Sequence, residues 1–356
     1  MAVLNEEQEM LRDMARDWAV NESPVTEFRK VRASGEPEAF NRDAYATMAQ
    51  MGWAGVIIPE EHGGSDFGFL SAGLVVEELG KTLTASPLVM NTVAASAIVL
   101  GGSDEQKARW LPRLASGEAI ATLAVDEGPS HDPAKIETSV SDGKLSGTKA
   151  FVHEAHGADL FVVAAKDGLY LVEKGDGVAL TTRKLTDQRS HADIAFDGAP
   201  ADRLAEGDDN LLDDVLDRAR VLIAAEMLGM AQAVFDTTLD YLKQRVQFNQ
   251  VLATFQALQH RMADLFADLA QMRSAVEAGL QAVDSGFGVA RAATVAKVEA
   301  NRVIHRMSNE GIQLHGGIGM TDEYDVGFYL KRARVLEASF GTSGYLKDRF
   351  ATLGGY

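Results

Sequence analysis

Apolar side chains recur every three or four positions through the first 118 residues, which is the spacing of a helix with one buried face. In NEEQEMLRDMARDWAV, one helical face carries Met10, Leu11, Met14 and Trp18. LSAGLVVEELGKTL is expected to end as a helix near Gly80. SDEQKARWLPRLASGE should begin at a Ser103 or Asp104 cap and break or kink at Pro112. We therefore predict a helical N-terminal domain over residues 1–118.

Between residues 119 and 207 the pattern changes to short segments that are rich in β-branched residues. Examples are AIATLAV, KLSGTKAFV, DLFVVAA, LYLVEK and ADIAFDG. Asp-Gly pairs at 142–143 and 167–168 separate some of them, and this dipeptide favours the tight turn of a hairpin. The sequence predicts a small β domain, either a sandwich or a barrel of short antiparallel strands.

The helical period returns after residue 208 and continues to the C-terminus. Long helical segments begin at LLDDVLDRAR, FQALQHRMAD and VARAATVAKV, and short connections join them, as in an antiparallel four-helix bundle. The predicted fold class is therefore α+β and multidomain. A helical domain (1–118) precedes a small antiparallel β domain (119–207), and a C-terminal helical bundle (208–356) follows.

Composition limits the chemistry that this chain can perform. The 356 residues include no cysteine, which removes disulfides, thiolate nucleophiles and thiolate metal sites. The histidines of HEAH, His153 and His156, lack a third ligand, so we expect no metal site. A formal charge of -18 argues against a nucleic-acid partner, whose phosphates need a basic surface. An anionic cofactor remains compatible, because a few local arginines and helix N-termini can hold phosphate.

The N-terminal segment mixes acidic residues throughout, which is typical neither of a signal peptide nor of an Arg-rich transit peptide. No run of residues approaches the ~20 apolar positions of a membrane-spanning helix. We therefore predict a cytoplasmic protein with no membrane partner.

Five segments, in order along the chain, resemble recurrent blocks of one enzyme family. They are GWAGVIIPEEHGG (52–64), EELGKT (77–82), SDEQKARWLPRLASGE (103–118), RVQFNQVLATFQALQHRMADL (245–265) and QLHGGIGMTDEYDVGFYLKRARV (313–335). One short motif has a high false-positive rate, but five in order are specific. The chain thus resembles the acyl-CoA dehydrogenases over nearly its whole length. The resemblance implies FAD, an acyl-CoA substrate, a carboxylate that removes the α-proton, and electron-transfer flavoprotein as electron acceptor.

The resemblance assigns the ADP half of FAD to residues that reach a neighbour across a dimer interface. The positions that match this reach are Arg245, Phe248 and Gln256, and Gln313, Gly316 and Gly317 match the next family block, also at the ADP half. A guanidinium can bind pyrophosphate through two N–H groups, and glycines let backbone N–H groups approach phosphate. The alternative is that HGGIG is only a turn between helices and that the arginine is an ordinary surface charge.

For the flavin ring, the resemblance points to the β domain. Asp126, in DEGPSHD, stands where the family usually has Thr and could accept from flavin N3–H. FVH matches a W-I-T or W-I-S stretch, so Phe151 would keep an aromatic surface on the flavin and His153 could donate to N5. Alternatively, His153 is an ordinary polar residue at a strand end.

Two residues match positions that the family uses near the acyl-CoA. Asp217 and Arg220, in LDRARVLIAAE, stand where the family often has an acid and an arginine. The alternative is an i, i+3 ion pair on an exposed helix turn.

The catalytic carboxylate is missing from both positions that the family uses. Aligning LEASFGTSGYL with the family's Y-E-G-T block places Gly341 and Thr342 on the Gly-Thr pair, with Thr342 also expected at the cofactor. Phe340 then occupies the position of the Glu, and phenylalanine cannot accept a proton. The second position, on the first long helix of the bundle, is Ala219.

Two other carboxylates lie nearest in the sequence. Glu226 is a candidate base, although a buried, hydrogen-bonded structural role is favoured for it, and Glu337 is favoured as a helix-surface acid. Three functions remain compatible. The favoured one is a dehydrogenase subunit in a heteromeric dimer of dimers, whose homologous partner chain supplies the Glu; a homomeric dimer of dimers belongs to the self-sufficient alternative. Such assemblies often act on bulky esters such as steroid side-chain thioesters. The others are a self-sufficient dehydrogenase with a relocated base, and a flavin monooxygenase or acyl-CoA-binding module on the same fold.

Overall fold

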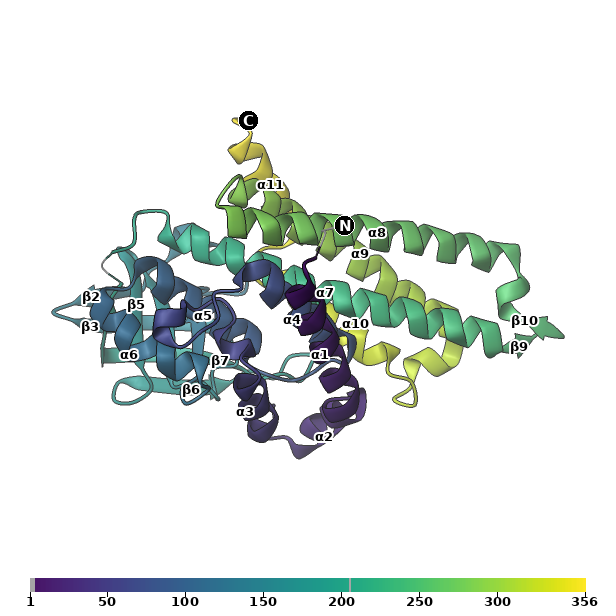
Figure 1. Cartoon of the computed structure of the whole chain (residues 1–356), viewed down its shortest axis with the longest axis horizontal. Coiled ribbons are helices and arrows are strands. Elements are labelled where there is room, and N and C mark those ends of the chain that lie inside the picture. The colour runs from purple at the N-terminus through teal and green to yellow at the C-terminus, as the bar shows by residue number, and fades with distance from the viewer. Residues whose placement is uncertain (1–3, 205) are drawn as a thin grey trace. The chain divides into compact units, whose positions relative to one another are not determined.

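The computed structural model describes residues 4–204 and 206–356, and the chain forms two compact units within them (Figure 1). The helical unit comprises residues up to 25, residues 73–84 and residues 220–356. The sheet unit comprises residues 26–72 and 85–219. Helices α4 and α7 have residues in both units, and so does α2 through its first residue, Val25. The domain boundaries at residues 118 and 207 are divisions of the sequence and stay predictions.

Long helices make up most of the helical unit, as the 3.6-residue pattern predicts. Its described elements are α1 (Glu6–Glu22), the end of α4 (Gly68–Lys81), most of α7 (Leu211–Gln244), β9 (Val246–Gln247), β10 (Gln250–Val251), η4 (Leu252–Thr254), α8 (Gln256–Ser285), α9 (Val289–His315), η5 (Gly316–Met320), α10 (Val326–Ala338) and α11 (Ser343–Leu353). Helix α9 packs against α8, α10 and α11. The predicted C-terminal helical bundle is confirmed.

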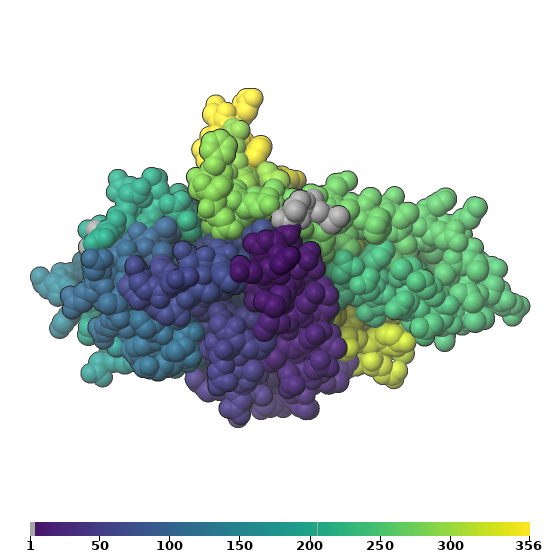
Figure 2. Space-filling model, in the orientation of Figure 1, coloured from purple at the N-terminus to yellow at the C-terminus, as the bar shows by residue number. Residues whose placement is uncertain are grey.

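Glycines allow α7 to approach its neighbours closely. Gly279 of α8 lies against Val221, and Gly311 of α9 lies against Val234, so that a β-carbon on either glycine would come within 3.1 Å of the valine. At the other end of α9, Arg349 of α11 donates to the carbonyl of Ala290 at 3.0 Å. Figure 2 shows the C-terminal residues, in yellow, at the surface of this unit. The bundle therefore packs through small residues inside and is closed by polar contacts at its rim.

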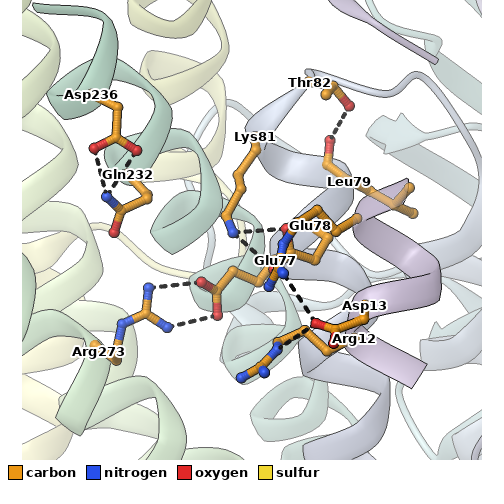
Figure 3. A network of polar contacts seen from close by, with 11 residues as sticks. Arg12, Asp13, Glu77, Glu78, Leu79, Lys81, Thr82, Gln232, Asp236 and Arg273 are labelled. Carbon is orange, nitrogen blue, oxygen red and sulfur yellow. Dashed lines mark hydrogen bonds and ion pairs between the residues drawn. The ribbon is translucent and has the colours of Figure 1, made fainter. Parts of the chain in front are cut away.

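Ion pairs on the end of α4 fasten α1 and α4 to the bundle (Figure 3). Glu77 accepts two hydrogen bonds from Arg273 of α8, at 2.8 and 3.0 Å. Glu78 pairs with Lys81 at 2.7 Å and with Arg16 of α1 at 3.3 Å. Both carboxylates are buried, so the paired cations offset the cost of removing them from water.

The sheet unit combines short helices with the predicted β domain. Its described elements are α2 (Val25–Ser34), α3 (Arg42–Gln50), η1 (Trp53–Gly55), η2 (Glu60–His62), the start of α4, α5 (Leu88–Gly101), α6 (Asp104–Ala115), β1 (Ala121–Ala124), η3 (Pro133–Lys135), β2 (Ser139–Ser141), β3 (Lys144–His153), β4 (Leu160–Ala165), β5 (Gly168–Glu173), β6 (Val178–Thr182), β7 (His191–Pro200) and β8 (Asp202–Arg203). Ser103 caps α6 as predicted, and α6 continues past Pro112 to its end.

The described strands of the sheet unit form two four-stranded sheets, ordered β1-β4-β5-β8 and β2-β3-β7-β6. Phe161 of β4 and Phe196 of β7 meet edge-to-face with centroids 6.4 Å apart, so the sheets pack as a sandwich. β1 and β4 pair in parallel, whereas the sequence predicted antiparallel strands. The reason is that β2 and β3 belong to the other sheet, so the chain returns to β4 by a crossover.

Helix α7 corrects the expectation that no segment could span a membrane. It is long and apolar enough to do so by length and composition alone. In its most apolar window, however, 78% of the residues are buried inside the protein, which is typical of a core helix.

Candidate functional site

The residues expected at the ADP half of the cofactor lie at one end of the helical bundle. There α7 ends, the β9–β10 hairpin turns back toward α8, and α9 ends at His315 (Figure 1). Tyr241 of α7 stacks on His315 with ring centroids 4.4 Å apart, and its hydroxyl donates to the His315 carbonyl at 3.2 Å. These contacts join the hairpin that carries Arg245 and Phe248 to the turn at Gly316.

All six of these residues are exposed. Phe248 is 84% exposed and has φ 53°, because it and Asn249 (φ 62°) form the two-residue turn of the hairpin. Arg245, Gln256 and Gln313 face solvent, and β-carbons built on Gly316 and Gly317 would meet nothing within 4 Å. A cation, two amides and accessible backbone N–H groups form a donor set that suits a dinucleotide's phosphates and sugars.

In the sheet unit, the structure brings Asp126, Phe151 and His153 together. The backbone N–H of Ala150 donates to the Asp126 carbonyl at 2.7 Å, which ties the loop after β1 to β3. The Thr122 hydroxyl donates to the His153 carbonyl at 2.6 Å. Phe151 has φ 54°, its N–H donates to the Asp193 carboxylate at 3.1 Å, and its ring is 36% exposed. An aromatic ring and an imidazole are thus placed on one strand end.

Two histidines that the sequence analysis missed contact the residues at this end of β3. His131 Nδ1 lies 2.8 Å from the Asp126 carboxylate, and its side chain is buried. The Asp126 carboxylate is therefore engaged within its own loop. The rings of His153 and His191 lie 4.6 Å apart in a T-shaped arrangement. The contact of His153 with His191 could not be predicted from sequence spacing, because His191 comes from β7.

Glu127 closes the loop that Asp126 begins. Its carboxylate accepts from the Thr138 hydroxyl at 2.6 Å, from the N–H groups of Glu137 and Thr138 at 2.7 and 2.9 Å, and from Lys149 at 2.8 Å. Burial by itself would raise the pKa of Glu127, but the hydrogen bonds outweigh burial and lower the pKa to about 2. The loop is therefore organised around an ionised carboxylate.

The loop after α10 carries Phe340, at the position where the family has its base. Buried side chains of α7 and α9 bind the backbone carbonyls of this loop and of the end of α10. Arg220 Nε donates to the Phe340 carbonyl at 3.0 Å. Lys297 donates to the Leu336 carbonyl at 2.9 Å, and the Asn301 amide approaches the Gly341 carbonyl at 3.4 Å. The sequence analysis missed Lys297 and Asn301. A signal was present, because both fall on the apolar face of the α9 pattern, where a polar residue needs partners.

Thr342 is separate from the residues at the hairpin end. It caps α11, with its hydroxyl oxygen accepting from the Tyr345 N–H at 3.4 Å, and it is exposed. Gly341, which precedes Thr342, lies beside Asn301 in the middle of α9, whereas Gly316 follows the end of α9. About 22 Å of helix, at 1.5 Å per residue, therefore separates the two positions.

The two carboxylates that the sequence analysis considered as bases are both engaged. The Glu226 oxygens accept from Arg332 at 2.8 and 3.1 Å, and both side chains are less than 10% exposed. Glu337 pairs with Arg334 and lies 3.0 Å from His305 Nδ1. Proton abstraction by either would have to disrupt an existing pair.

Asp217 and Arg220 are 1% and 0% exposed, so the alternative of an ion pair on an exposed helix turn is wrong. The helix pattern alone did not reveal this, because α7 is buried on nearly every side. Among the described residues, no group of three or more His, Asp or Glu side chains could hold a metal ion.

Comparisons with known proteins agree with the fold. Sequence models of the acyl-CoA dehydrogenase N-terminal and C-terminal domains match residues 5–118 and 210–352. The chain is 31% identical to the probable acyl-CoA dehydrogenase YngJ of Bacillus subtilis, over 96% of each chain. It is 32% identical to the acyl-CoA dehydrogenase IpdE2 of Mycobacterium tuberculosis, over 92% of this chain and 91% of that protein. A solved structure of a Tcur3481-Tcur3483 steroid ACAD variant superposes with TM-score 0.92 at 30% identity, covering 98% of each chain.

The chain therefore belongs to the acyl-CoA dehydrogenase family, and its cofactor is FAD. The residues of this chain fit that cofactor at both ends. The open Gly316–Gly317 turn and exposed Arg245 suit a pyrophosphate, while the half-exposed ring of Phe151 beside His153 suits a flat ring system.

Proposed function

We propose that this chain is a subunit of a FAD-dependent acyl-CoA dehydrogenase and that a homologous partner chain supplies the catalytic Glu. The observation that carries the proposal is the loop at Phe340. Its backbone is held by Arg220, Lys297 and Asn301, yet the residue at the base position cannot take a proton. The loop is held by buried side chains although it carries no base, which supports a role for its backbone at the substrate.

In this function, the N–H of Phe340 donates to the thioester oxygen, which stabilises the enolate-like charge that develops when the α-proton leaves. Phe151 and His153 would contact the flavin ring, and Asp217 and Arg220 would lie on the substrate side. When bound, FAD would supply the acceptor for the β-hydrogen as hydride, and electron-transfer flavoprotein would take up the electrons.

The exposed hairpin supports an oligomer. Phe248, at the tip of the hairpin, packs against little of its own unit. The hydrogen-bond donors of Arg245, Gln256 and Gln313 are also exposed to solvent. Exposed apolar side chains rimmed by polar groups mark interaction sites. We infer that these residues complete the ADP site of a neighbouring subunit in a dimer of dimers.

A bulky acyl-CoA ester is the proposed substrate. The solved relative at 30% identity is described as a steroid ACAD, and the chain covers almost all of it. We further expect the protein to be cytoplasmic and to have no nucleic-acid or membrane partner.

The test is to purify this chain alone and together with a homologous, Glu-bearing chain. FAD content, mass and acyl-CoA-dependent reduction of an artificial acceptor would be measured for each. We expect turnover only with the partner. Stoichiometric FAD and full turnover by the chain alone would instead support the self-sufficient alternative. FAD binding and oxygen-dependent product formation without dehydrogenation would support the monooxygenase.

A further inference from the structure

The loop between α10 and α11 adopts a backbone conformation that Phe340 does not favour. Phe340 has φ 53° and Gly341 has φ 125°. The left-handed region is uncommon for a bulky non-glycine residue, and such residues persist where the surroundings hold them. Phe340 is also buried, so its side chain is confined as well. Something outside the loop must therefore hold this conformation.

The carbonyl groups of the loop and of the end of α10 are held by side chains from two other helices. Lys297 of α9 donates to the Leu336 carbonyl at 2.9 Å and to Asn301 Oδ1 at 2.7 Å, and it lies 3.5 Å from the Gly341 carbonyl. The Asn301 amide lies 3.4 Å from the carbonyls of both Glu337 and Gly341. Four carbonyls, including the one at Phe340 that Arg220 binds, thus face one polar cluster.

This cluster is costly to bury. Lys297 and Arg220 are both 0% exposed, and they carry like charges near one another. Burial, and secondarily the charge of Arg220, lowers the pKa of Lys297 to about 7. A simple turn between helices does not require buried cationic side chains, because a glycine and a capping residue are enough to end one helix and begin the next.

We propose that Lys297, together with Asn301 and Arg220, is a positioning group that fixes the Phe340–Gly341 backbone so that its N–H groups face a thioester carbonyl. The clamp acts through backbone carbonyls, so it keeps this geometry whatever side chain stands at position 340. With the Ser339 N–H bonded to the end of α10 and the Phe340 carbonyl bonded to Arg220, the Phe340 N–H has little freedom left. This role rests on the proposed function, because it assumes that a thioester reaches the loop.

The test uses Lys297→Met, which keeps the length of the side chain and removes its hydrogen bonds. Lys347→Met, an exposed lysine on α11, is the matched control. Each variant is prepared as the FAD-loaded assembly, and its affinity is measured for an acyl-CoA thioester and for the corresponding S-alkyl-CoA thioether, which has no carbonyl. We expect the dissociation constant of Lys297→Met for the thioester to rise about tenfold, as for one lost charged hydrogen bond. Its affinity for the thioether, and both affinities of Lys347→Met, should stay unchanged.

Equal weakening of both ligands, or no change in either, would overturn the positioning role. Hydrogen exchange provides a readout that needs no substrate. Lys297→Met should speed exchange of amides in 336–343 and leave β4 unaffected. If the wild type does not bind the thioester more tightly than the thioether, the proposed function fails. The hydrogen exchange of residues 336–343 then decides by itself whether Lys297 holds the loop.

A second variant covers the case in which Lys297→Met does not fold. Asn301→Asp keeps the size of the side chain and an acceptor for Lys297, but it removes the amide that approaches the carbonyls of Glu337 and Gly341. The same selective loss of thioester affinity is expected, and wild-type behaviour in both the affinity and the exchange measurements would overturn the proposal.

Discussion

Glu226 of α7 and Arg332 of α10 form a buried pair in which both carboxylate oxygens accept hydrogen bonds from one guanidinium, at 2.8 and 3.1 Å. The side chains are 8% and 9% exposed. A carboxylate held in this way links two helices of the bundle and is poorly placed to receive a proton from a substrate. The pair therefore bears on both stability and the location of the base.

Glu226→Gln should lower the free energy of unfolding by about 3 kcal/mol, because it leaves a buried guanidinium without its counter-charge. Chemical denaturation measures this. Replacing both residues, as in Glu226→Leu with Arg332→Met, should recover much of the loss, since no buried charge is then left unpaired. A Glu226→Gln protein of normal stability that has lost all turnover in the assembly would identify Glu226 as the base after all.

Phe340→Glu should give this chain a base on a loop that is already held in place. We expect acyl-CoA-dependent reduction of an artificial acceptor by the FAD-loaded chain without a Glu-bearing partner. Phe340→Gln is the control, since it has similar size and polarity but cannot take the proton. Activity in both variants, or in neither when both bind FAD and acyl-CoA, would show that residue 340 does not decide catalysis.

The pKa of Glu127 predicts how stability changes with acid. Its pKa is about 2 in the folded protein against an ordinary value of 4.5, so the folded state binds the proton less readily than the unfolded chain. Its stabilising contribution is therefore full above pH 4.5 and is lost as the pH falls toward 2. Thermal midpoints of the wild type should fall more steeply across this window than those of Glu127→Gln. Parallel curves would contradict this assignment.

Gly229 marks a close crossing of α7 and α4. A β-carbon there would lie 1.9 Å from the backbone oxygen of Glu77, and one on Gly80 would lie 2.4 Å from that of Glu226. Gly229→Ala should destabilise the protein by about 1–3 kcal/mol, because the helices must move apart. Gly344→Ala is the control, since its nearest neighbour is 3.9 Å away and alanine favours helix by about 0.5 kcal/mol or more. Equal midpoints of unfolding for the two variants would contradict the prediction.

Because the hairpin is exposed, we expect a substitution at its tip to affect assembly without affecting the stability of the isolated chain. Phe248→Ser should leave the thermal midpoint of the isolated chain unchanged, since its ring is 84% exposed, but it should reduce oligomer mass and FAD retention. Phe287→Ser alters a ring that is 86% exposed in the loop between α8 and α9, and it should change neither. Mass photometry and flavin absorbance report both properties. Loss of FAD in both variants would show that exposure, and not the hairpin, is responsible.

Much of the fold follows from local pattern. The helical periods, the Ser103 cap and the hairpin at Asp142–Gly143, where both residues have positive φ, need only neighbouring residues for their explanation. The parallel pairing of β1 with β4 does not, because it depends on which sheet the intervening strands join. Strands β2 and β6 escaped prediction for a related reason, since they are short and largely exposed and carry little hydrophobic signal.

The sequence by itself determined the family, the cofactor and the absence of a carboxylate at Phe340, because these depend on which residues occur and in what order. Tertiary structure decided how the remaining polar residues are used. It paired Glu226 with Arg332, and the Phe340 loop with Lys297, Asn301 and Arg220. The partners in these sets are up to 120 residues apart in the chain. Buried charges select partners by proximity in space, and no local spacing in the sequence encodes that proximity.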